Sequence, residues 1–381
     1  MTTSHRPHRP HRPRALVVGS TFGLHYSRGL AHPDSPVELA GIVARGSDRS
    51  RALADRFGVP FYPLPDFTEP VTSLSAAGLP EVELACVVVR SAVSGGPGDD
   101  ITRFFLQSGT SVLQEHPVHP RSIVQQLHTA RAATPSQVVA ATGVAHPVYA
   151  VNPFYPTLPT VQNLVRCVST LRQQSRIMAV EVRGSMHIFY AILAILADML
   201  PGLPRLILQR ENIAQQGVNK QVYNLTLDWD GTPVDIRLYN RVAPLDPDNH
   251  SQPLFGCVVE CEDGELIFDH MHGPVRWMPR SHYANGTFTH SADVPASMLV
   301  GDDEFTDAGA GPFREFTGRE LLEELWPRGV MNRVGAVAAA TCQQEAFGQR
   351  DLALTKLWQE VAAEIPRPVT IDSVPPRQIV W

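Results

Sequence analysis

Short apolar runs alternate with amphipathic segments along the first 150 residues of the chain. Each run is continuously apolar, which indicates a strand buried on both faces, as in a parallel sheet covered by helices. The runs are residues 15–18, 38–44, 84–89 and 111–114, and the helical segments between and after them are residues 23–31, 49–57, 100–108 and 120–133. This order of strand and helix predicts a doubly wound Rossmann domain with a parallel sheet over residues 14–150.

The pattern changes near Asn152. A proline-rich stretch is followed by longer runs in which apolar and polar positions alternate, at residues 221–228, 234–240, 255–261 and 265–270. Alternation is typical of antiparallel strands with one covered face. One strongly apolar helix is expected at residues 186–200. We therefore predict that residues 151–381 form an α+β domain with a mostly antiparallel open sheet, so that the whole chain belongs to the α/β class.

Composition narrows the class of protein. The net charge of −6 gives no basic field for a phosphate backbone, so nucleic acid is not expected as a partner. The most apolar stretch, residues 188–200, is too short to cross a bilayer. The five cysteines form no zinc-like or redox-like pair and the N-terminus lacks a secretion signal, so we expect a cytoplasmic protein. Residues 1–13 repeat His-Arg-Pro three times and are predicted to be a disordered tail.

The turn after the first strand is a candidate dinucleotide site. Such a site needs a tight turn, small residues and a helix N-terminus that receives the pyrophosphate. Gly19 and Gly23 fill two of the three glycine roles, whereas Val18 and Ser20 stand where the first two glycines would align. An ordinary strand-to-helix turn explains the same residues equally well. The predicted binding residues in this turn are Gly19, Ser20, Thr21, Phe22 and Gly23.

The end of the second strand indicates which dinucleotide is bound. NAD enzymes place a carboxylate there for the ribose, whereas NADP needs cationic and hydroxyl groups for the 2′-phosphate. The chain provides three arginines, two serines and a glycine within seven residues at a helix N-terminus, which favours NADPH/NADP. The alternative is that Asp48 caps the helix and the arginines form a solvated face. The predicted phosphate-binding residues are Arg45, Gly46, Ser47, Arg49 and Arg51.

Two further loops follow the next strands. Arg90 and Ser91 begin a glycine-rich loop, residues 90–98, which lies where a nicotinamide ribose would bind or which is simply a flexible surface loop. The fifth strand ends in Gln-Glu-His-Pro-Val-His-Pro, residues 114–120. A histidine near a proline is often only a turn residue. The position of His116 at the carboxyl end of a central strand favours a functional role, with Glu115 beside it.

These strings together resemble a known family. In Gfo/Idh/MocA oxidoreductases the corresponding strand ends in Glu-Lys-Pro, and this chain has histidine in place of the lysine. Within that family it closely resembles the thiazolinyl imine reductases of yersiniabactin-like and pyochelin-like siderophore assembly. The strings that carry the resemblance are residues 17–23, 44–47, 88–91, 114–120 and 151–156, and more weakly 246–248, 273–277 and 354–358.

The resemblance implies reduction of a thiazoline C=N bond to a thiazolidine, with hydride from NADPH. It makes His116 and Tyr155 the candidate catalytic proton donors and places Glu115 and His116 near the cofactor. It also implies a substrate tethered by phosphopantetheine to a carrier domain of a nonribosomal peptide synthetase, and a homodimer. We expect the arm to enter past Tyr155 and the loop 246–250, with Arg241 or Arg276 either steering the carrier or serving as plain surface charges.

The residues are also compatible with other interpretations. No metal is expected, although His116 and His119 are three residues apart and leave a metal pair open. A sugar or cyclitol dehydrogenase is one competing function. It is disfavoured because residues 186–195 have alanines where those relatives place an Asp and a His. In that stretch His187 and Tyr190 either face the pocket or form a buried core pair. A non-catalytic NADP-binding scaffold protein is the third interpretation.

Overall fold

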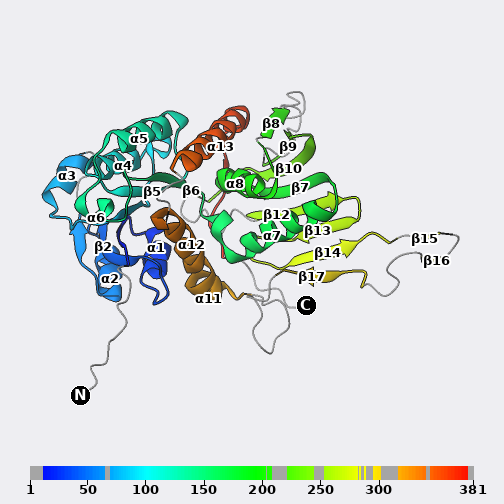
Figure 1. The fold of residues 1–381 in the computed structure, drawn as a ribbon, viewed down its shortest axis with the longest axis horizontal. Helices are drawn as coiled ribbons and strands as arrows, with labels where there is room; N and C mark the ends of the chain where they lie inside the picture. The colour runs from blue at the N-terminus through cyan, green and yellow to red at the C-terminus, as the bar shows by residue number, and fades with distance from the viewer. Residues whose placement is uncertain are drawn as a thin grey trace, which may run out of the picture. The chain divides into compact units, whose positions relative to one another are not determined.

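The computed structural model describes residues 12–64, 69–202, 204–207, 221–243, 253–281, 283–284, 287–288, 295–301, 316–339 and 344–375. Most of the predicted tail therefore lies outside the described residues. The chain divides into two compact units (Figure 1). The described residues up to Phe154, together with those of Leu322–Leu352, form the first unit. Those of Tyr155–Leu321 and Ala353–Trp381 form the second.

The first unit is built on a six-stranded sheet in the order β3-β2-β1-β4-β5-β6, with all pairs parallel. Leu16, Val17 and Leu113 are fully buried, as expected for strands covered on both faces. The order changes direction at β1, which is the switch point where doubly wound folds bind ligands. The strands are β1 (Arg14–Val18), β2 (Glu38–Ala44), β3 (Phe61–Pro63), β4 (Leu84–Val87), β5 (Ser111–Glu115) and β6 (Tyr149–Asn152). The predicted Rossmann sheet is confirmed.

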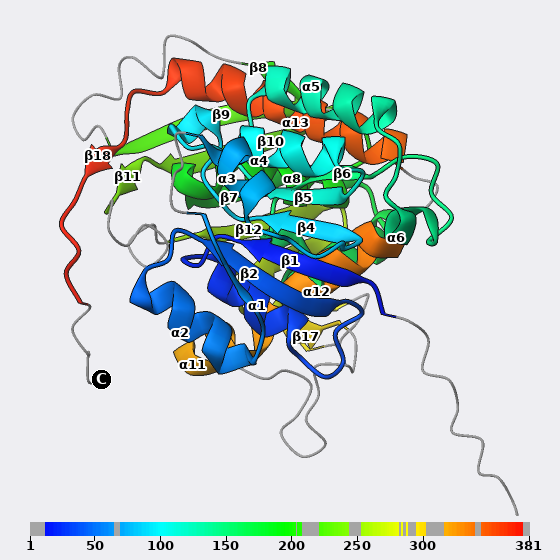
Figure 2. The same cartoon turned by 90° about the vertical axis from the view of Figure 1, so that its left-hand side faces the viewer.

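Helices connect these strands and cover the sheet (Figure 2). They are α1 (Gly23–Leu30), α2 (Asp48–Phe57), α3 (Pro70–Ala76), α4 (Gly98–Gln107), α5 (Pro120–Ala132) and α6 (Gln137–Ala140). The chain later returns to this unit with α12 (Trp326–Ala339) and the first part of α13 (Gln344–Glu364). Helix α12 packs on α1 so closely that a Cβ at Gly29 would lie 2.8 Å from the carbonyl oxygen of Pro327.

The second unit contains an eight-stranded sheet in the order β17-β14-β13-β12-β7-β10-β9-β8. Within the described strands of this sheet, only the β7–β10 pair is parallel, which confirms a mostly antiparallel mixed sheet. The strands are β7 (Ile177–Ser185), β8 (Pro204–Ile207), β9 (Val222–Trp229), β10 (Thr232–Tyr239), β12 (Phe255–Cys261), β13 (Gly264–Phe268), β14 (Val275–Pro279) and β17 (Met298–Val300). Two small sheets pair β11 (Arg241–Val242) with β18 (Val369–Thr370), and β15 (Tyr283–Ala284) with β16 (Thr287–Phe288).

The apolar helix of the second unit lies where the sequence predicts it. A short 3₁₀ turn, η3 (Met186–Ile188), leads into α8 (Phe189–Met199), which runs beside α7 (Pro159–Gln174). A Cβ at Gly184 of β7 would lie 2.3 Å from Cδ1 of Ile192, so this glycine allows α8 to approach the sheet. Among the described residues, no helix combines the length and the apolar composition needed to cross a membrane.

Candidate active site

The turn between β1 and α1 has the backbone geometry that a dinucleotide requires. Gly19 has φ +111°, and a Cβ there would lie 2.4 Å from the carbonyl oxygen of Val88, so only glycine fits. Gly23 is buried and begins α1. Phe22 occupies the N-cap position, and among the described residues no side chain caps the first turn. The backbone N–H groups of this turn therefore suit the pyrophosphate of a nicotinamide dinucleotide.

The predicted phosphate site after β2 lies against this turn. Arg49 Nη2 donates a hydrogen bond to Thr21 Oγ1 at 2.7 Å, which joins the start of α2 to the loop after β1. Ser47 is the N-cap of α2, and its Oγ accepts from the backbone N–H of Ser50 at 3.3 Å. The alternative in which Asp48 caps this helix is therefore wrong, because Asp48 is the first helical residue.

The other members of the arginine cluster have different surroundings. Arg51 Nε donates to the carbonyl oxygen of Gly46 at 3.3 Å, and its guanidinium lies 5.1 Å from the ring centroid of Phe61. This places Arg51 as a support for the loop. Arg45, directly after β2, is exposed, and Arg49 in the first turn of α2 is exposed too. Arg51 is exposed as well, and the binding of a 2′-phosphate by this cluster stays a prediction.

The glycine-rich loop after β4 is tightly folded. The N–H of Gly96 donates to the carbonyl oxygen of Ser91 at 2.9 Å, and that of Gly98 donates to Arg90. A Cβ at Gly96 would lie 2.1 Å from the carbonyl oxygen of Arg90. Residues 92–95 are exposed, so the loop lies at the surface, and its role at the nicotinamide ribose stays a prediction. Ser91 is buried and its Oγ donates to the carbonyl oxygen of Pro117 at 2.5 Å, so its hydroxyl joins this loop to the turn after β5.

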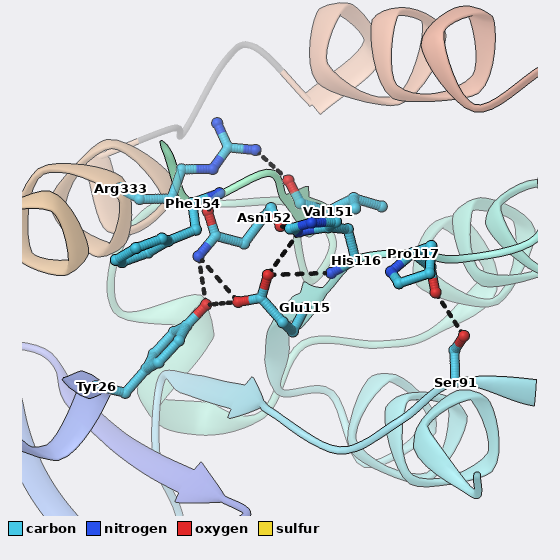
Figure 3. A network of polar contacts seen from close by, with 9 residues as sticks. All are labelled: Tyr26, Ser91, Glu115, His116, Pro117, Val151, Asn152, Phe154 and Arg333. Atoms are coloured by element: carbon cyan, nitrogen blue, oxygen red, sulfur yellow. Dashed lines mark hydrogen bonds and ion pairs between the residues drawn. The ribbon is translucent and has the colours of Figure 1, made fainter. Parts of the chain in front are cut away.

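His116 is held by two acceptors on the same ring nitrogen (Figure 3). Its Nδ1 lies 2.7 Å from Oε1 of Glu115 and 2.9 Å from the backbone oxygen of Asn152, which faces Glu115 across the β5–β6 pair. A carboxylate and a carbonyl both accept, so the proton between them belongs to Nδ1. The proton that His116 exchanges with another molecule is then the one on Nε2.

The second oxygen of Glu115 is held from the opposite side. Tyr26 on α1 donates its hydroxyl to Oε2 at 2.5 Å, and Asn152 Nδ2 lies 3.5 Å from the same oxygen and also donates to the Tyr26 hydroxyl (Figure 3). Burial, reinforced by the charge of Glu115, raises the pKa of Tyr26 well above its usual value. Tyr26 therefore remains a neutral hydrogen-bond donor. Burial likewise raises the pKa of the Cys86 thiol on β4, with a further contribution from Glu115.

Asn152 connects this network to the end of the first unit. Its Oδ1 accepts from the backbone N–H of Phe154 at 2.9 Å, and Phe154 has φ +58°, a left-handed conformation that is uncommon for a bulky residue. The buried Phe154 ring makes edge contacts with Phe22 and Trp326, with centroids at 5.1 and 5.4 Å. The polar network and the loop after β1 therefore share one aromatic support.

Two further predicted residues, Tyr155 and His119, belong to different elements of the fold. Tyr155 is buried and begins η2 (Tyr155–Thr157) in the second unit, and its role as a proton donor stays a prediction. His119 is the N-cap of α5, and its Nδ1 accepts from the N–H of Arg121 at 3.1 Å. The described residues contain no group of three His, Cys, Asp or Glu suited to a metal ion.

The predicted pair on the apolar helix, His187 and Tyr190, is not a buried pair, because His187 is exposed while Tyr190 is buried.

The two candidate steering arginines lie on different strands. Arg276 is exposed on β14 and donates to Ser297 Oγ at 3.1 Å, and Arg241 lies in β11. The loop 246–250 lies outside the described residues.

Sequence reasoning missed two members of the network. Tyr26 lies three residues after Gly23, on the buried face of α1, and only its position facing the sheet distinguishes it from a core tyrosine. Asn152 belongs to a string that carries the resemblance, but the string alone does not assign it a contact. Its pairing with Glu115 follows from β6 joining β5, and the sequence analysis did not identify β6 as a strand of this sheet.

Two family models match the chain. Residues 14–141 match the oxidoreductase family GFO_IDH_MocA with its NAD-binding Rossmann fold. Residues 175–278 match the C-terminal part of the Irp3-like thiazolinyl imine reductases. A comparison with curated proteins gives no match.

Solved structures agree on the fold. KijD10, a 3-ketoreductase from Actinomadura kijaniata solved with NADP and TDP-benzene, is 11% identical with a TM-score of 0.61, covering 95% of this chain and 100% of its own. UDP-N-acetylglucosamine 3-dehydrogenase GnnA from Acidithiobacillus ferrooxidans is 13% identical with a TM-score of 0.57, covering 93% and 97%. An oxidoreductase from Agrobacterium radiobacter solved with NAD+, L-tartaric acid and magnesium is 10% identical with a TM-score of 0.58, again covering 93% and 97%.

At identities of 10–13% the solved structures establish only the fold. The family to which each domain belongs follows from the two family models. The chain therefore combines an NAD-binding Rossmann domain of the Gfo/Idh/MocA oxidoreductase family with an Irp3-like C-terminal domain.

Proposed function

We propose that this protein reduces the C=N bond of a thiazoline to a thiazolidine with NADPH. The observation that carries the proposal is His116, whose Nδ1–H is held by a carboxylate, in a chain that also matches the C-terminal part of thiazolinyl imine reductases. An imidazole oriented in this way is suited to deliver one proton from Nε2. Reduction of an imine needs one hydride at carbon and one proton at nitrogen.

The backbone turn 19–23 and the exposed Arg45 and Arg49 would hold the dinucleotide. When bound, NADPH supplies the hydride to the imine carbon. As the C=N bond is reduced, the nitrogen gains an electron pair and becomes basic, and an imidazolium at His116 gives its Nε2 proton to that nitrogen. The Glu115 carboxylate, 2.7 Å from Nδ1, compensates the positive charge of the ring before transfer. Tyr155 is the second candidate donor.

We also propose NADPH rather than NADH as the preferred cofactor. Arg49 already contacts the loop after β1 through Thr21, so its guanidinium lies beside the turn that would hold the pyrophosphate. Arg45 adds a second exposed cation at the end of β2, where the adenosine ribose of a dinucleotide lies in this fold. Two cations at this place match the charge of a 2′-phosphate.

The tethered form of the substrate is part of the same proposal. A thiazoline made on an assembly line is carried as a thioester on a phosphopantetheine arm, and carrier domains are acidic. The exposed Arg276 would steer such a domain through long-range attraction, together with Arg241. Raised ionic strength should then lower kcat/KM for a carrier-bound substrate more than for a free pantetheine thioester.

The deciding experiment measures NADPH oxidation by the full chain with a synthetic thiazolinyl thioester of pantetheine. Turnover with formation of the thiazolidine, identified by mass spectrometry, supports the proposal. Oxidation of polyols or sugars with NADP, in place of thiazoline reduction, would instead identify a sugar or cyclitol dehydrogenase. NADPH binding in calorimetry without turnover of either substrate class would indicate a non-catalytic binding protein.

A further inference from the structure

The carboxylate of Glu115 is held on both of its oxygens, and each oxygen has a different kind of partner. Oε1 faces Nδ1 of His116 at 2.7 Å and accepts from the His116 backbone N–H at 3.3 Å. Oε2 accepts the Tyr26 hydroxyl at 2.5 Å and lies 3.5 Å from Asn152 Nδ2 (Figure 3). A carboxylate side chain otherwise rotates about its χ angles, so partners on Oε2 determine where Oε1 points.

Asn152 holds three other groups together. Its Nδ2 donates to the Tyr26 hydroxyl, its Oδ1 accepts from the N–H of Phe154 at 2.9 Å, and its backbone oxygen lies 2.9 Å from Nδ1 of His116. The orientation of the amide is fixed, because Oδ1 must face a donor and Nδ2 must face acceptors. Asn152 therefore joins α1, β5 and the end of β6.

We propose that Tyr26 and Asn152 are positioning residues which hold Glu115 against His116 and thereby keep the imidazole proton on Nδ1 and Nε2 aimed at the substrate. This inference rests on the proposed function for the identity of that substrate. Both residues act through Glu115, because they are buried, the Tyr26 hydroxyl donates to Glu115, and the Asn152 amide donates to Tyr26 and Glu115 and not to the imidazole ring. The raised pKa of Tyr26 agrees, since a phenol that stays protonated continues to donate to Glu115.

The first readout does not depend on any substrate. A proton on Nδ1 that is hydrogen-bonded to a carboxylate gives a far-downfield signal in proton NMR, and nitrogen-15 labelling of histidine identifies the protonated ring nitrogen. In the full chain with NADPH added, we expect His116 to show a protonated Nδ1 and a downfield Nδ1 proton. His116→Ala assigns both signals by removing them.

The main variant is Tyr26→Phe, which removes one hydroxyl and keeps the ring in the core. We expect the downfield signal to move upfield or broaden, and kcat for the thiazolinyl thioester to fall about three- to tenfold with KM and NADPH affinity unchanged. Asn152→Ala should act in the same direction. Asn152 also accepts a hydrogen bond from the N–H of Phe154, so Asn152→Ala can in addition impair folding. Tyr26→Phe, which keeps that contact, is therefore the variant that decides.

The matched control is Tyr149→Phe. Tyr149 is also fully buried and lies on β6, but its hydroxyl donates to Gln114 Oε1 at 2.9 Å, away from Glu115. This variant loses a buried hydroxyl of the same kind, so it should keep the His116 signal and kcat even where stability decreases. If Tyr26→Phe leaves the signal and kcat as they are, or if Tyr149→Phe alters them equally, the positioning role is wrong. Failure of the parent protein to reduce a thiazoline, with the His116 signals as expected, would instead overturn the proposed function alone.

Discussion

The carboxylate of Asp351 accepts a hydrogen bond from the backbone N–H of Val151 at 3.0 Å, although 200 residues separate them. The backbone oxygen of the same Val151 accepts from Arg333 Nη2 at 2.5 Å (Figure 3). Strand β6 is the last in the sheet order, so these main-chain groups face outward where another strand would pair. Side chains of the returning C-terminal segment satisfy them instead, next to Asn152.

Replacement of Asp351 should therefore destabilise the first unit. Asp351→Ala leaves a buried N–H without its acceptor, and we expect the free energy of unfolding to fall by about 1–3 kcal/mol. Asp351→Asn, which keeps one oxygen acceptor, should lose less. Urea denaturation followed by far-UV circular dichroism measures both. Asp100→Ala, which removes an exposed ion pair with Arg103, is the control and should change stability by less than about 1 kcal/mol. Equal losses for Asp351→Ala and the control would contradict the role given to this contact.

The sequence pattern predicted the long elements and missed the short and returning ones. Runs of four to seven apolar residues gave β1, β2, β4 and β5, because burial on both faces leaves a continuous apolar signal. β3 has only three residues, and β6 lies where the pattern changes near Asn152, so neither was predicted as a strand of this sheet. The return of α12 to the first unit has no local signal, since it depends on contacts such as that of Gly29 with Pro327.

Some site residues can also be predicted from the sequence, whereas others cannot. Gly19, Arg49 and His116 can be identified from the sequence, because a doubly wound fold places its cofactor contacts at the ends of particular strands. The capping by Ser47 in place of Asp48 depends on where the helix begins, and helix ends are poorly determined by pattern. The contacts of Tyr26 and Asn152 with Glu115 join three separate elements, so only the folded arrangement shows them.

Cofactor preference should depend on Arg49. A charge-assisted hydrogen bond to a 2′-phosphate contributes about 1.5–3 kcal/mol, so Arg49→Ala should weaken NADPH binding by about tenfold or more and leave NADH binding nearly unchanged. Calorimetric titration with each cofactor measures this. Arg56→Ala, a change in an exposed arginine in the last turn of the same helix, should affect neither. Parallel losses for NADPH and NADH in Arg49→Ala would show that Arg49 supports the loop and does not bind the phosphate.

The glycine at the end of β1 should tolerate no side chain. Gly19→Ala places a Cβ 2.4 Å from the backbone oxygen of Val88 at φ +111°, so we expect weaker binding of NADPH and a free energy of unfolding lower by more than about 1 kcal/mol. Gly58→Ala is a matched comparison, since Gly58 has φ +63° but its Cβ would meet nothing within 4 Å. That variant should lose only about 1 kcal/mol and keep cofactor affinity. Calorimetry and urea denaturation separate the two effects, and equal behaviour of the two variants would refute the close approach.

Stability should decrease in mild acid because of His272. Burial, with a smaller contribution from the neighbouring His270, lowers the pKa of His272 to about 4 from 6.5. Between these values the unfolded chain binds more protons at this residue than the folded chain, so its contribution is complete above pH 6.5 and is lost as the pH falls toward 4. The loss amounts to at most about 3 kcal/mol. Urea denaturation at a series of pH values should show a shallower decrease in His272→Gln, and an identical slope would contradict the assignment.

Proton delivery is tested by changing the two candidate donors separately. Loss of an effective general acid costs about 10² to 10⁴ in rate, so His116→Ala should lower kcat by that factor if the Nε2 proton goes to the thiazoline nitrogen. Tyr155→Phe removes the other hydroxyl and should then change kcat by less than about tenfold. Tryptophan fluorescence and NADPH titration establish that each variant is folded and binds the cofactor. The opposite ranking would assign the donor to Tyr155 and leave His116 with an orienting role. Near-normal turnover in both variants would mean that neither residue is the acid, and that water or a group of the substrate supplies the proton.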